Sequence, residues 1–382
     1  MVINLRSPYT IGTAQINASY AILDLYIWDG DSSDSTLPVY SLKKNSINST
    51  SNTSIFFELS ELIKDYIDLS FNGNYDFIEN SSIWFKTVQT VYNSSDAVIY
   101  TSNDSTKLGL DGYLYFEEFQ SIPPSTLITN RELFVLEDNV FRVPIYVNGS
   151  PTVVFYKDGK VIASEVFTPS TDSSGQIKYV SIFGDSFNWD TFQERVKDSL
   201  GDYELNPCLQ SFFDDYSIGA VDKITVSDGN GIETIKVNVI EECKYEPKKV
   251  TFINKFGALQ DMYFFKKSKE NLTIKKESYK SNIVTTYGTY QRNNHVNRDF
   301  NVIGNESISL SSGYLSEEYN EVFKQLLLSE KVWVTNILET GEQVVPINVK
   351  TSSIAYKTSV NDKLVDYTIE FNKSFDTINN IR

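Results

Sequence analysis

The sequence predicts a mainly β protein, of the β-rich α+β class, built from two or three β-sandwich or small-barrel domains. Aromatic residues make up 14% of the 382 residues, with 24 Tyr and 24 Phe, whereas the chain has only two Met and four Trp. This composition favours strands and argues against disorder. Alternation of apolar and polar residues recurs along the chain, and helical periodicity is confined to short segments. We therefore expect each domain to carry one or two short amphipathic helices packed on a sheet.

Residues 1–125 are expected to form an N-terminal β domain with one helix. Tyr20–Trp28 alternates strictly, so one face of this strand should be buried. Residues 55–58 predict a short strand that runs into a helix capped by Ser60. The apolar stripe of that helix consists of Leu59, Leu62, Ile63, Tyr66 and Ile67. Two more strands are expected at 83–92 and 112–119, and Pro123-Pro124 marks the domain boundary.

Residues 126–247 are expected to form a middle domain rich in β-hairpins. Asn148-Gly149 is a type I′ hairpin signal between strands at 143–147 and 152–156. The strongest hairpin signal is Asp158-Gly159, which should return the chain as a strand at 161–167. A further hairpin is expected where Asp228-Gly229-Asn230-Gly231 separates strands at 224–226 and 232–240.

The middle range also contains two short helical patterns. Residues 188–200 predict a helix with Asp190 as its N-cap and Gln193 as the capping-box partner. A second helical turn is expected to start at Pro207, which suits the first position of a helix.

Residues 248–382 are expected to form a C-terminal β domain. A hairpin of strands at 250–254 and 261–265 turns at 255–258, long polar strands fill 272–290, and strands at 344–349 and 364–371 complete the sheet. Residues 316–329 predict a helix between two strands, with Ser316 as N-cap and Glu317 and Glu318 in the first turn. Its apolar face consists of Tyr319, Val322, Phe323, Leu326 and Leu327. A charge at Phe323 or Leu327 should therefore unfold this domain.

The net charge of the chain limits the classes of partner that we expect it to bind. The net charge is −16, and basic residues come in runs no longer than pairs such as Lys266-Lys267 and Lys275-Lys276. Phosphate binding needs a basic stripe, so we expect no nucleic acid partner. No stretch of about 18 apolar residues predicts a membrane-spanning helix, and the first ten residues do not have the pattern of a secretory signal. Such acidity is typical of a protein that must stay soluble before it assembles.

Residues that often carry chemistry are sparse and badly spaced. His295 is the single histidine and lies in a polar run, which indicates an exposed loop. Cys208 and Cys243 do not have zinc-finger spacing. We favour a reduced, buried pair, and a disulfide stays open as the alternative. Asp228 begins a hairpin turn that lacks the spaced acids of a calcium loop. The segment 252–265 allows a ligand-stacking interpretation, but a buried hairpin explains it better.

Carboxylate pairs are the remaining enzymatic alternative. Glu117-Glu118 ends an aromatic strand, and Asp185 and Asp190 flank an aromatic pair, Phe187 and Trp189. A glycosidase needs two acids across an aromatic cleft. Adjacent residues of a strand point to opposite faces, so Glu117 and Glu118 do not converge by themselves. No phosphate-binding loop, dinucleotide fingerprint or nucleophile elbow is present. We therefore expect no enzyme activity, no cofactor, and no catalytic, cofactor-binding or metal-binding residues.

Four segments resemble an uncharacterised family of virion proteins found in tailed bacteriophages and prophages. In order they are INLRSPYTIG with AILDLYIWDG, then FELSELIKDYID, then VTFINKFGALQDMYFFKKS, and finally ISLSSGYLSEEYNEVFKQLLLSEKVWV with VVPINVKTSSIAYKTSVNDKLVDYTIEF. They cover both ends of the chain, and the middle third is poorly covered. The resemblance brings no catalytic residues.

The resemblance implies a structural component of a tail or baseplate, located in the virion and assembled in the host cytoplasm. Its partners would be other copies of itself in a ring and neighbouring tail proteins, with no nucleic acid and no membrane insertion. A position at the head–tail connector stays open. The alternative is a tail module that binds a host receptor or a glycan. One form of this alternative is a module that also degrades polysaccharide. In either form the site would lie in residues 141–240.

Overall fold

The structure is a computed structural model that describes most of the chain. The described residues are 2–28, 36–46, 53–73, 75, 82–121, 123–136, 140–147, 149–167, 177–183, 221–228, 231–242, 244–284, 287–289, 292–338, 341–356 and 364–378. Within these residues the chain is mainly β, with two short helices, α1 (Ser60–Lys64) and α4 (Tyr319–Leu328). The predicted fold class is therefore confirmed.

The N-terminal part is a sandwich of two sheets. Its larger sheet has the order β1-β8-β6-β3-β4, and β7 also pairs with β6. The strands are β1 (Val2–Asn4), β3 (Tyr20–Trp28), β4 (Tyr40–Asn45), β6 (Ser82–Tyr92), β7 (Val98–Asn103) and β8 (Lys107–Leu110). The smaller sheet pairs β2 (Thr10–Gln15) with β5 (Thr53–Glu58). Alternate residues of β3 are buried with Ile55 and Phe57 of β5 in one core, as the strict alternation of β3 predicts.

The middle part contains a five-stranded sheet and a separate strand pair. The sheet has the order β12-β11-β14-β15-β9, and β10 pairs with β13. The strands are β9 (Glu132–Leu136), β10 (Val140–Tyr146), β11 (Thr152–Lys157), β12 (Lys160–Val166), β13 (Ile177–Phe183), β14 (Lys223–Ser227) and β15 (Ile232–Ile240). The predicted hairpins β11–β12 and β14–β15 are confirmed, because both strand pairs are antiparallel neighbours.

The C-terminal part is built on a seven-stranded sheet of order β17-β16-β21-β22-β24-β19-β18. Its strands are β16 (Lys248–Ile253), β17 (Leu259–Phe264), β18 (Lys269–Lys280), β19 (Asn297–Ser311), β21 (Val332–Leu338), β22 (Gly341–Val349) and β24 (Thr368–Lys373), and β20 (Leu315–Ser316) pairs with β23 (Leu364–Val365). The hairpin β16–β17 is buried, with Gly257 at φ +77° in its turn, as predicted. Helix α4 lies against this sheet and buries Phe323 between Phe264 and Tyr367.

The middle and C-terminal parts share one apolar core. Side chains from Ile128 to Phe371 form a single buried cluster, and Phe134 of β9 packs on Tyr319 of α4. A buried amide chain also joins the two parts: Asn254 Nδ2 donates to Leu127 O at 2.6 Å, and Gln260 Nε2 donates to Asn130 Oδ1 at 3.3 Å. The strands of each larger sheet all come from one of the three predicted domain ranges. The middle and C-terminal ranges nevertheless share this core across their boundary at residue 247, so the division into three domains stays a prediction.

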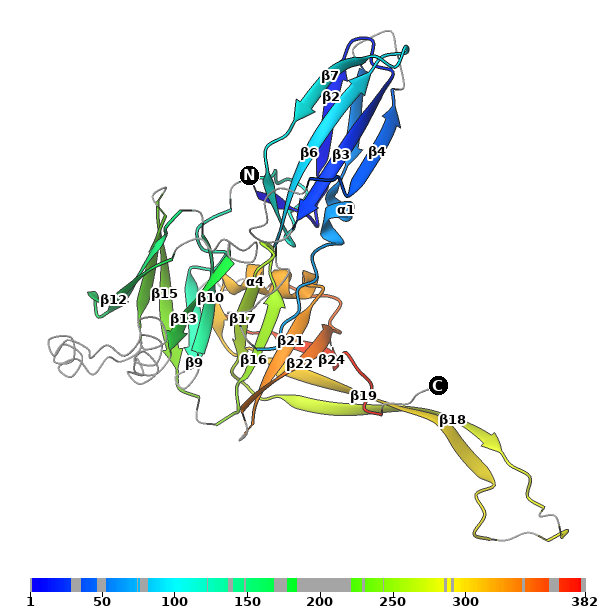
Figure 1. Ribbon diagram of the computed structural model, residues 1–382. Helices are drawn as coiled ribbons and strands as arrows, with labels where there is room; N and C mark the ends of the chain where they lie inside the picture. Colours follow the sequence, from blue (N-terminus) through cyan, green and yellow to red (C-terminus); the bar gives the residue numbers. More distant parts are fainter. Residues whose placement is uncertain are drawn as a thin grey trace, which may run out of the picture.

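A strap joins the N-terminal part to the C-terminal sheet. Leu69, Phe71 and Tyr75 follow helix α1 and pack on Ile253, Leu259 and Trp333. Figure 1 shows the N-terminal sheets extending from one side of the body and the β18–β19 pair extending from another. The strap therefore holds the projecting N-terminal sheets to the body, whereas the β18–β19 pair continues directly from the seven-stranded sheet.

Neither helix begins at the residue that was predicted. Ser60 is the first residue of α1 and does not cap it; its N–H and hydroxyl both bond to the Glu58 carboxylate, and the chain leaves the helix after Lys64. Ser316 lies in strand β20, and α4 begins after Glu318. Glu318 is the N-cap residue of α4 and thus precedes its first turn, and its carboxylate accepts a hydrogen bond from Arg131 N at 3.0 Å.

Other expectations were wrong in pairing or extent. Residues 112–119 do not form a strand, because Tyr113 N donates to Lys255 O in the β16–β17 turn; strands β7 and β8 were missed instead. Gly149 has φ +90°, but β10 and β11 on either side lie in different sheets and form no hairpin. The strand expected at 364–371 is split, because Tyr367 N turns aside to Ser312 Oγ. The helices expected at 188–200 and Pro207 lie outside the described residues.

Candidate assembly surface

A two-stranded arm is the most exposed regular element that the structure describes. We call residues 269–305 the arm; they include β18 and the outer part of β19, and all but 285–286 and 290–291 are described. The two strands pair antiparallel from Lys269↔Ser309 to Lys280↔Asn297. Strand β24 pairs with β19 only from Ser307 to Ser311, so the arm extends beyond the sheet as a ribbon. Figure 1 shows this ribbon projecting away from the body.

A bulge and two cross-strand pairs shape the ribbon. The register shifts between Lys275 and Glu277, where Asn301 has φ +53° and donates from Nδ2 to Glu277 Oε1 at 3.0 Å. Bulges of this kind increase the local twist of a ribbon. At the bulge, Lys276 Nζ and Asp299 Oδ2 lie 2.6 Å apart, so an exposed ion pair also joins the two strands.

Apolar side chains occupy both faces of the arm. Leu272 and Ile274 are 55% and 58% exposed and share one face, because they lie two residues apart on β18. Tyr279 and Phe300 are 48% and 45% exposed, and their rings meet edge to face with centroids 5.6 Å apart. An isolated two-stranded ribbon is only marginally stable in water. The arm therefore leaves apolar side chains exposed on a ribbon that has little stability of its own.

The arm differs in charge from the rest of the chain. Its basic residues are Lys269, Lys275, Lys276, Lys280, Arg292 and Arg298, and its acidic residues are Glu270, Glu277 and Asp299. The arm therefore carries a net charge of +3, whereas the other 345 residues carry −19. This local excess was missed from the sequence, because the basic residues are spread over two strands and make no long run.

The base of the arm is held by the C-terminal segment. Thr377 N donates to Gly304 O at 2.8 Å, and Lys373 pairs with Glu306. The hydrogen bond from Lys373 lowers the pKa of the Glu306 carboxyl. A Cβ at Gly304 would lie 3.2 Å from Thr377 Cβ, so glycine permits this close crossing. The arm is therefore anchored where it leaves the sheet and exposed beyond that point.

A second exposed surface lies on the loop after β8. Phe116 is fully exposed and Phe119 is 87% exposed, beside a hollow of about 250 Å³ that Tyr113 and Pro124 help to line. Tyr115 and Glu118 fix the loop, through hydrogen bonds to Glu321 and Lys255 of the C-terminal part. Burial, followed by the bond to Glu321, raises the pKa of the Tyr115 hydroxyl. This loop is a smaller, rigid aromatic surface.

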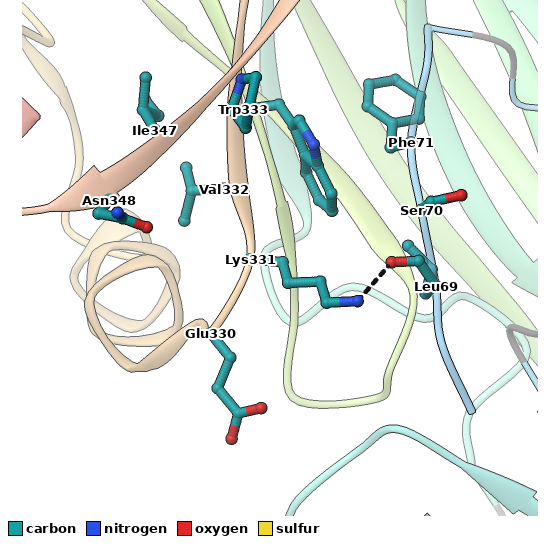
Figure 2. Close-up of a pocket in the computed structure, with 10 residues that line it drawn as sticks. Leu69, Ser70, Phe71, Glu330, Lys331, Val332, Trp333, Ile347 and Asn348 are labelled. Carbon is teal, nitrogen blue, oxygen red and sulfur yellow. Dashed lines mark hydrogen bonds between the residues drawn. The ribbon is translucent and has the colours of Figure 1, made fainter. Parts of the chain in front are cut away.

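Figure 2 shows the residues that line a shallow pocket between the strap and β21. The pocket has a volume of about 270 Å³. Its two charged side chains are already engaged. Lys331 Nζ donates to Leu69 O and to Asp68 Oδ1, each at 2.8 Å, while Glu330 pairs with Arg6 and with Lys64 at 3.2 Å. The hydrogen bond from Lys331 lowers the pKa of Asp68. The two charged side chains of the pocket, Glu330 and Lys331, are thus used in ion pairs and hydrogen bonds that hold the N-terminal part and the strap to the start of β21.

The acids considered in the sequence do not form a pair that the structure describes. Glu118 bonds to Lys255 and to Tyr115 N, and Glu117 is exposed on the same turn. Since this segment is a loop, the opposite-face argument made for a strand does not apply. Asp185 and Asp190, with Phe187 and Trp189, lie outside the described residues.

The remaining candidates for chemistry have structural roles or are not described. His295 is exposed near the outer end of the arm, and its carbonyl accepts a hydrogen bond from Arg298 Nε at 3.1 Å. Asp228 accepts from Ser125 Oγ beside the β14–β15 turn. Cys208 and Cys243 lie outside the described residues. Within the described ranges, no three His, Cys, Asp or Glu side chains are grouped so that they could hold a metal ion, and no helix is long and apolar enough to cross a membrane.

Comparisons with known proteins add little. No protein-family model and no curated protein matches the chain. Among solved structures, a chimeric titin Z1Z2 carrying an exogenous KLER peptide from decorin matches at 13% identity and a TM-score of 0.16, over 62% of this chain and 97% of that chain. A similarity at this TM-score carries no argument about fold or function.

Proposed function

We propose that this protein is a structural subunit of a bacteriophage virion, most directly a ring or adaptor of the tail or baseplate, and that it acts by protein–protein assembly. The observation that carries the proposal is the arm: a ribbon exposed on both faces, anchored at its base and bearing apolar side chains. A subunit of an assembly has a partner to cover such a surface.

The rest of the structure supports the proposal. The charged groups of the described pockets are used in ion pairs between parts of the chain, and the exposed aromatic loop offers a second contact surface. Two different projecting surfaces on one subunit suit head-to-tail contacts, which generate rings when the rotation closes. The proposed location is the virion tail, after assembly in the host cytoplasm.

Electron microscopy of the virion tests the proposal. Particles are purified, their proteins are identified by mass spectrometry, and the chain is located in the density. We expect symmetric density for the chain in the tail, between tube and fibres. Absence of the chain from purified particles would refute the proposal.

The alternative, a glycan-binding tail module, is less well supported. Such a module would need an exposed aromatic surface, since Tyr and Trp combine a large apolar ring with a polar group. In the described residues of 141–240 the large exposed apolar side chains are Val161, Val166 and Ile232, none of them aromatic. Density for the chain at fibre tips alone, together with binding on a glycan array, would favour this alternative.

A further inference from the structure

We infer that the partner of the arm is a second copy of this chain, and that the cationic arm of one copy docks on the acidic body of the next. This inference rests on the proposed assembly function and names the contact that would perform it. It can fail while that function holds, because the arm could instead bind a different tail protein.

Charge selects the body of a second copy as the docking surface. The arm carries +3 and the other residues of the same chain carry −19. Two arms repel each other, and two bodies repel each other, but an arm and a body attract. The contact is therefore between two different surfaces, and such a heterologous contact can propagate from copy to copy until a ring closes.

The arm is also large enough for the task. Strand β18 has 12 residues, of which the nine from 272 to 280 extend beyond the part of β19 that pairs with β24. At ~3.4 Å per residue they give a ribbon of about 30 Å by roughly 10 Å for two strands. Each face then offers roughly 300 Å², and the two faces together roughly 600 Å², which is what one partner contributes at the lower end of the standard interface size.

The arrangement of side chains suits this docking. The apolar residues Leu272 and Ile274 on one face, and Tyr279 and Phe300 on the other, are flanked by lysines along the ribbon. Lysines on an edge strand discourage direct strand addition. The arm is thus expected to dock through its faces, with apolar side chains as anchors and lysines above the acidic surface.

Sedimentation velocity of the purified full-length chain tests the charge argument. We expect self-association that weakens by about tenfold or more when NaCl is raised from roughly 0.05 M to 0.5 M, because salt screens the attraction. The variant Lys275→Glu/Lys280→Glu should weaken it by a further factor of about ten or more at low salt. The control Lys43→Glu/Lys350→Glu has the same net charge and changes exposed lysines outside the arm. It leaves the arm cationic and makes the body more acidic, so it should associate at least as strongly as the unmodified chain.

The apolar anchors are tested in the same assay. Leu272→Ser/Ile274→Ser should weaken self-association by about tenfold or more, and the matched control Val161→Ser/Ile232→Ser should not. All four side chains are more than half exposed, so neither variant removes a buried contact. Equal unfolding transitions for both variants and the unmodified chain show that the fold is intact.

A photo-crosslinker at Tyr279 identifies the contact directly. The chain carrying it is mixed with isotope-labelled, unmodified chain, and crosslinked peptides are identified by mass spectrometry. Links from the crosslinker at position 279 to residues outside 269–305 of the isotope-labelled chain support the inference. Links only between arms, a chain that stays monomeric at all concentrations, or a monomer whose arm binds DNA would overturn it.

The outcomes separate the two proposals. A chain that is monomeric in solution but present in the tail density refutes docking between copies and leaves the structural role intact. A chain that associates through its arm but is absent from virions refutes the structural role and leaves the docking intact.

Discussion

The hydroxyl group of Tyr75, on the strap, donates a hydrogen bond to the carboxylate of Asp261, on β17. The same carboxylate accepts from Thr251 Oγ1 at 2.7 Å and from Arg142 N at 3.3 Å, and the Arg142 guanidinium lies 5.4 Å from the Tyr75 ring centre. Burial and the nearby charge of Asp261 raise the pKa of Tyr75 well above its ordinary value. Residues from three parts of the chain thus meet at one buried acid.

Replacement of Tyr75 by Phe should destabilise the protein by about 1.5–3 kcal/mol, because a buried carboxylate loses a hydrogen-bond donor. The ring stays in place against Phe71, so packing is retained. Tyr66→Phe is the control, since the Tyr66 hydroxyl is exposed and lies 3.5 Å from Tyr40; its cost should be below about 0.5 kcal/mol. Chemical denaturation measures both, and equal losses would contradict the prediction.

Gly257 and Gly159 give a matched pair for backbone crowding. Both have φ +77° in a hairpin turn, but a Cβ at Gly257 would lie 2.8 Å from the backbone of Asp111 and Gly112, whereas a Cβ at Gly159 would meet nothing within 4 Å. Gly159→Ala should therefore cost only the left-handed strain, about 1–2 kcal/mol. Gly257→Ala should cost clearly more, about 3 kcal/mol or above, because two backbone segments must separate. Thermal unfolding of the two variants would contradict this account if the losses were the same.

Much of the sheet structure could be predicted because it depends on local pattern. The alternation of Tyr20–Trp28 and the turn residues Asp158-Gly159 place β3 and the β11–β12 hairpin correctly, since period and turn chemistry act within a few residues. Pairing between distant segments is not coded in this way. The signal at Asn148-Gly149 predicted a hairpin, yet β10 pairs with β13 because the better partner lies elsewhere in the fold.

The candidate surface was only partly predictable. Long polar strands were expected at 272–290, but nothing local shows that a strand leaves its sheet. Leu272 and Ile274 fall on one face, and Tyr279 and Phe300 pair across strands, so the apolar surface exists only once the register is known. The cap at Ser316 failed for a similar reason, because Ser316 pairs with the distant Leu364 in the β20–β23 strand pair.

Replacement of Asp111 by Asn should stabilise the protein at neutral pH. Asp111 Oδ1 is buried and has no hydrogen-bond partner among the described residues, and this burial raises the pKa of the carboxyl despite the opposing effect of Arg6 and Lys64. The charged form is therefore disfavoured in the folded state. We expect a gain of about 1 kcal/mol at pH 7, from removal of a buried, incompletely paired charge.

The pH dependence of that gain follows from the sign of the shift. Below the ordinary value of 3.8, Asp111 is protonated in both the folded and the unfolded state and costs nothing. As pH rises, the unfolded state ionises first, and the penalty grows until the pH exceeds the raised folded pKa. The difference in free energy of unfolding between Asp111→Asn and the unmodified chain should thus grow as the pH rises from 3.8 through the raised folded pKa. It should vanish near pH 3. Glu241→Gln, at an exposed site, is the control, and a gain that persists unchanged at pH 3 would contradict the explanation.

Helix α4 separates two substitutions that the sequence treats alike. Phe323 is fully buried, with its ring centroid 4.7 Å from Tyr367 and 6.3 Å from Phe264, whereas Leu327 is only partly buried. Phe323→Ala should cost about 3–5 kcal/mol, because it leaves a cavity between two aromatic rings. Leu328→Ala, on the exposed end of the same helix, should cost below about 1 kcal/mol. A charge at Leu327 should likewise be far milder than one at Phe323, because the side chain can turn toward water. Denaturant titration of the four variants measures the difference, and an equal loss at Phe323 and Leu327 would show that α4 packs less selectively than its buried face indicates.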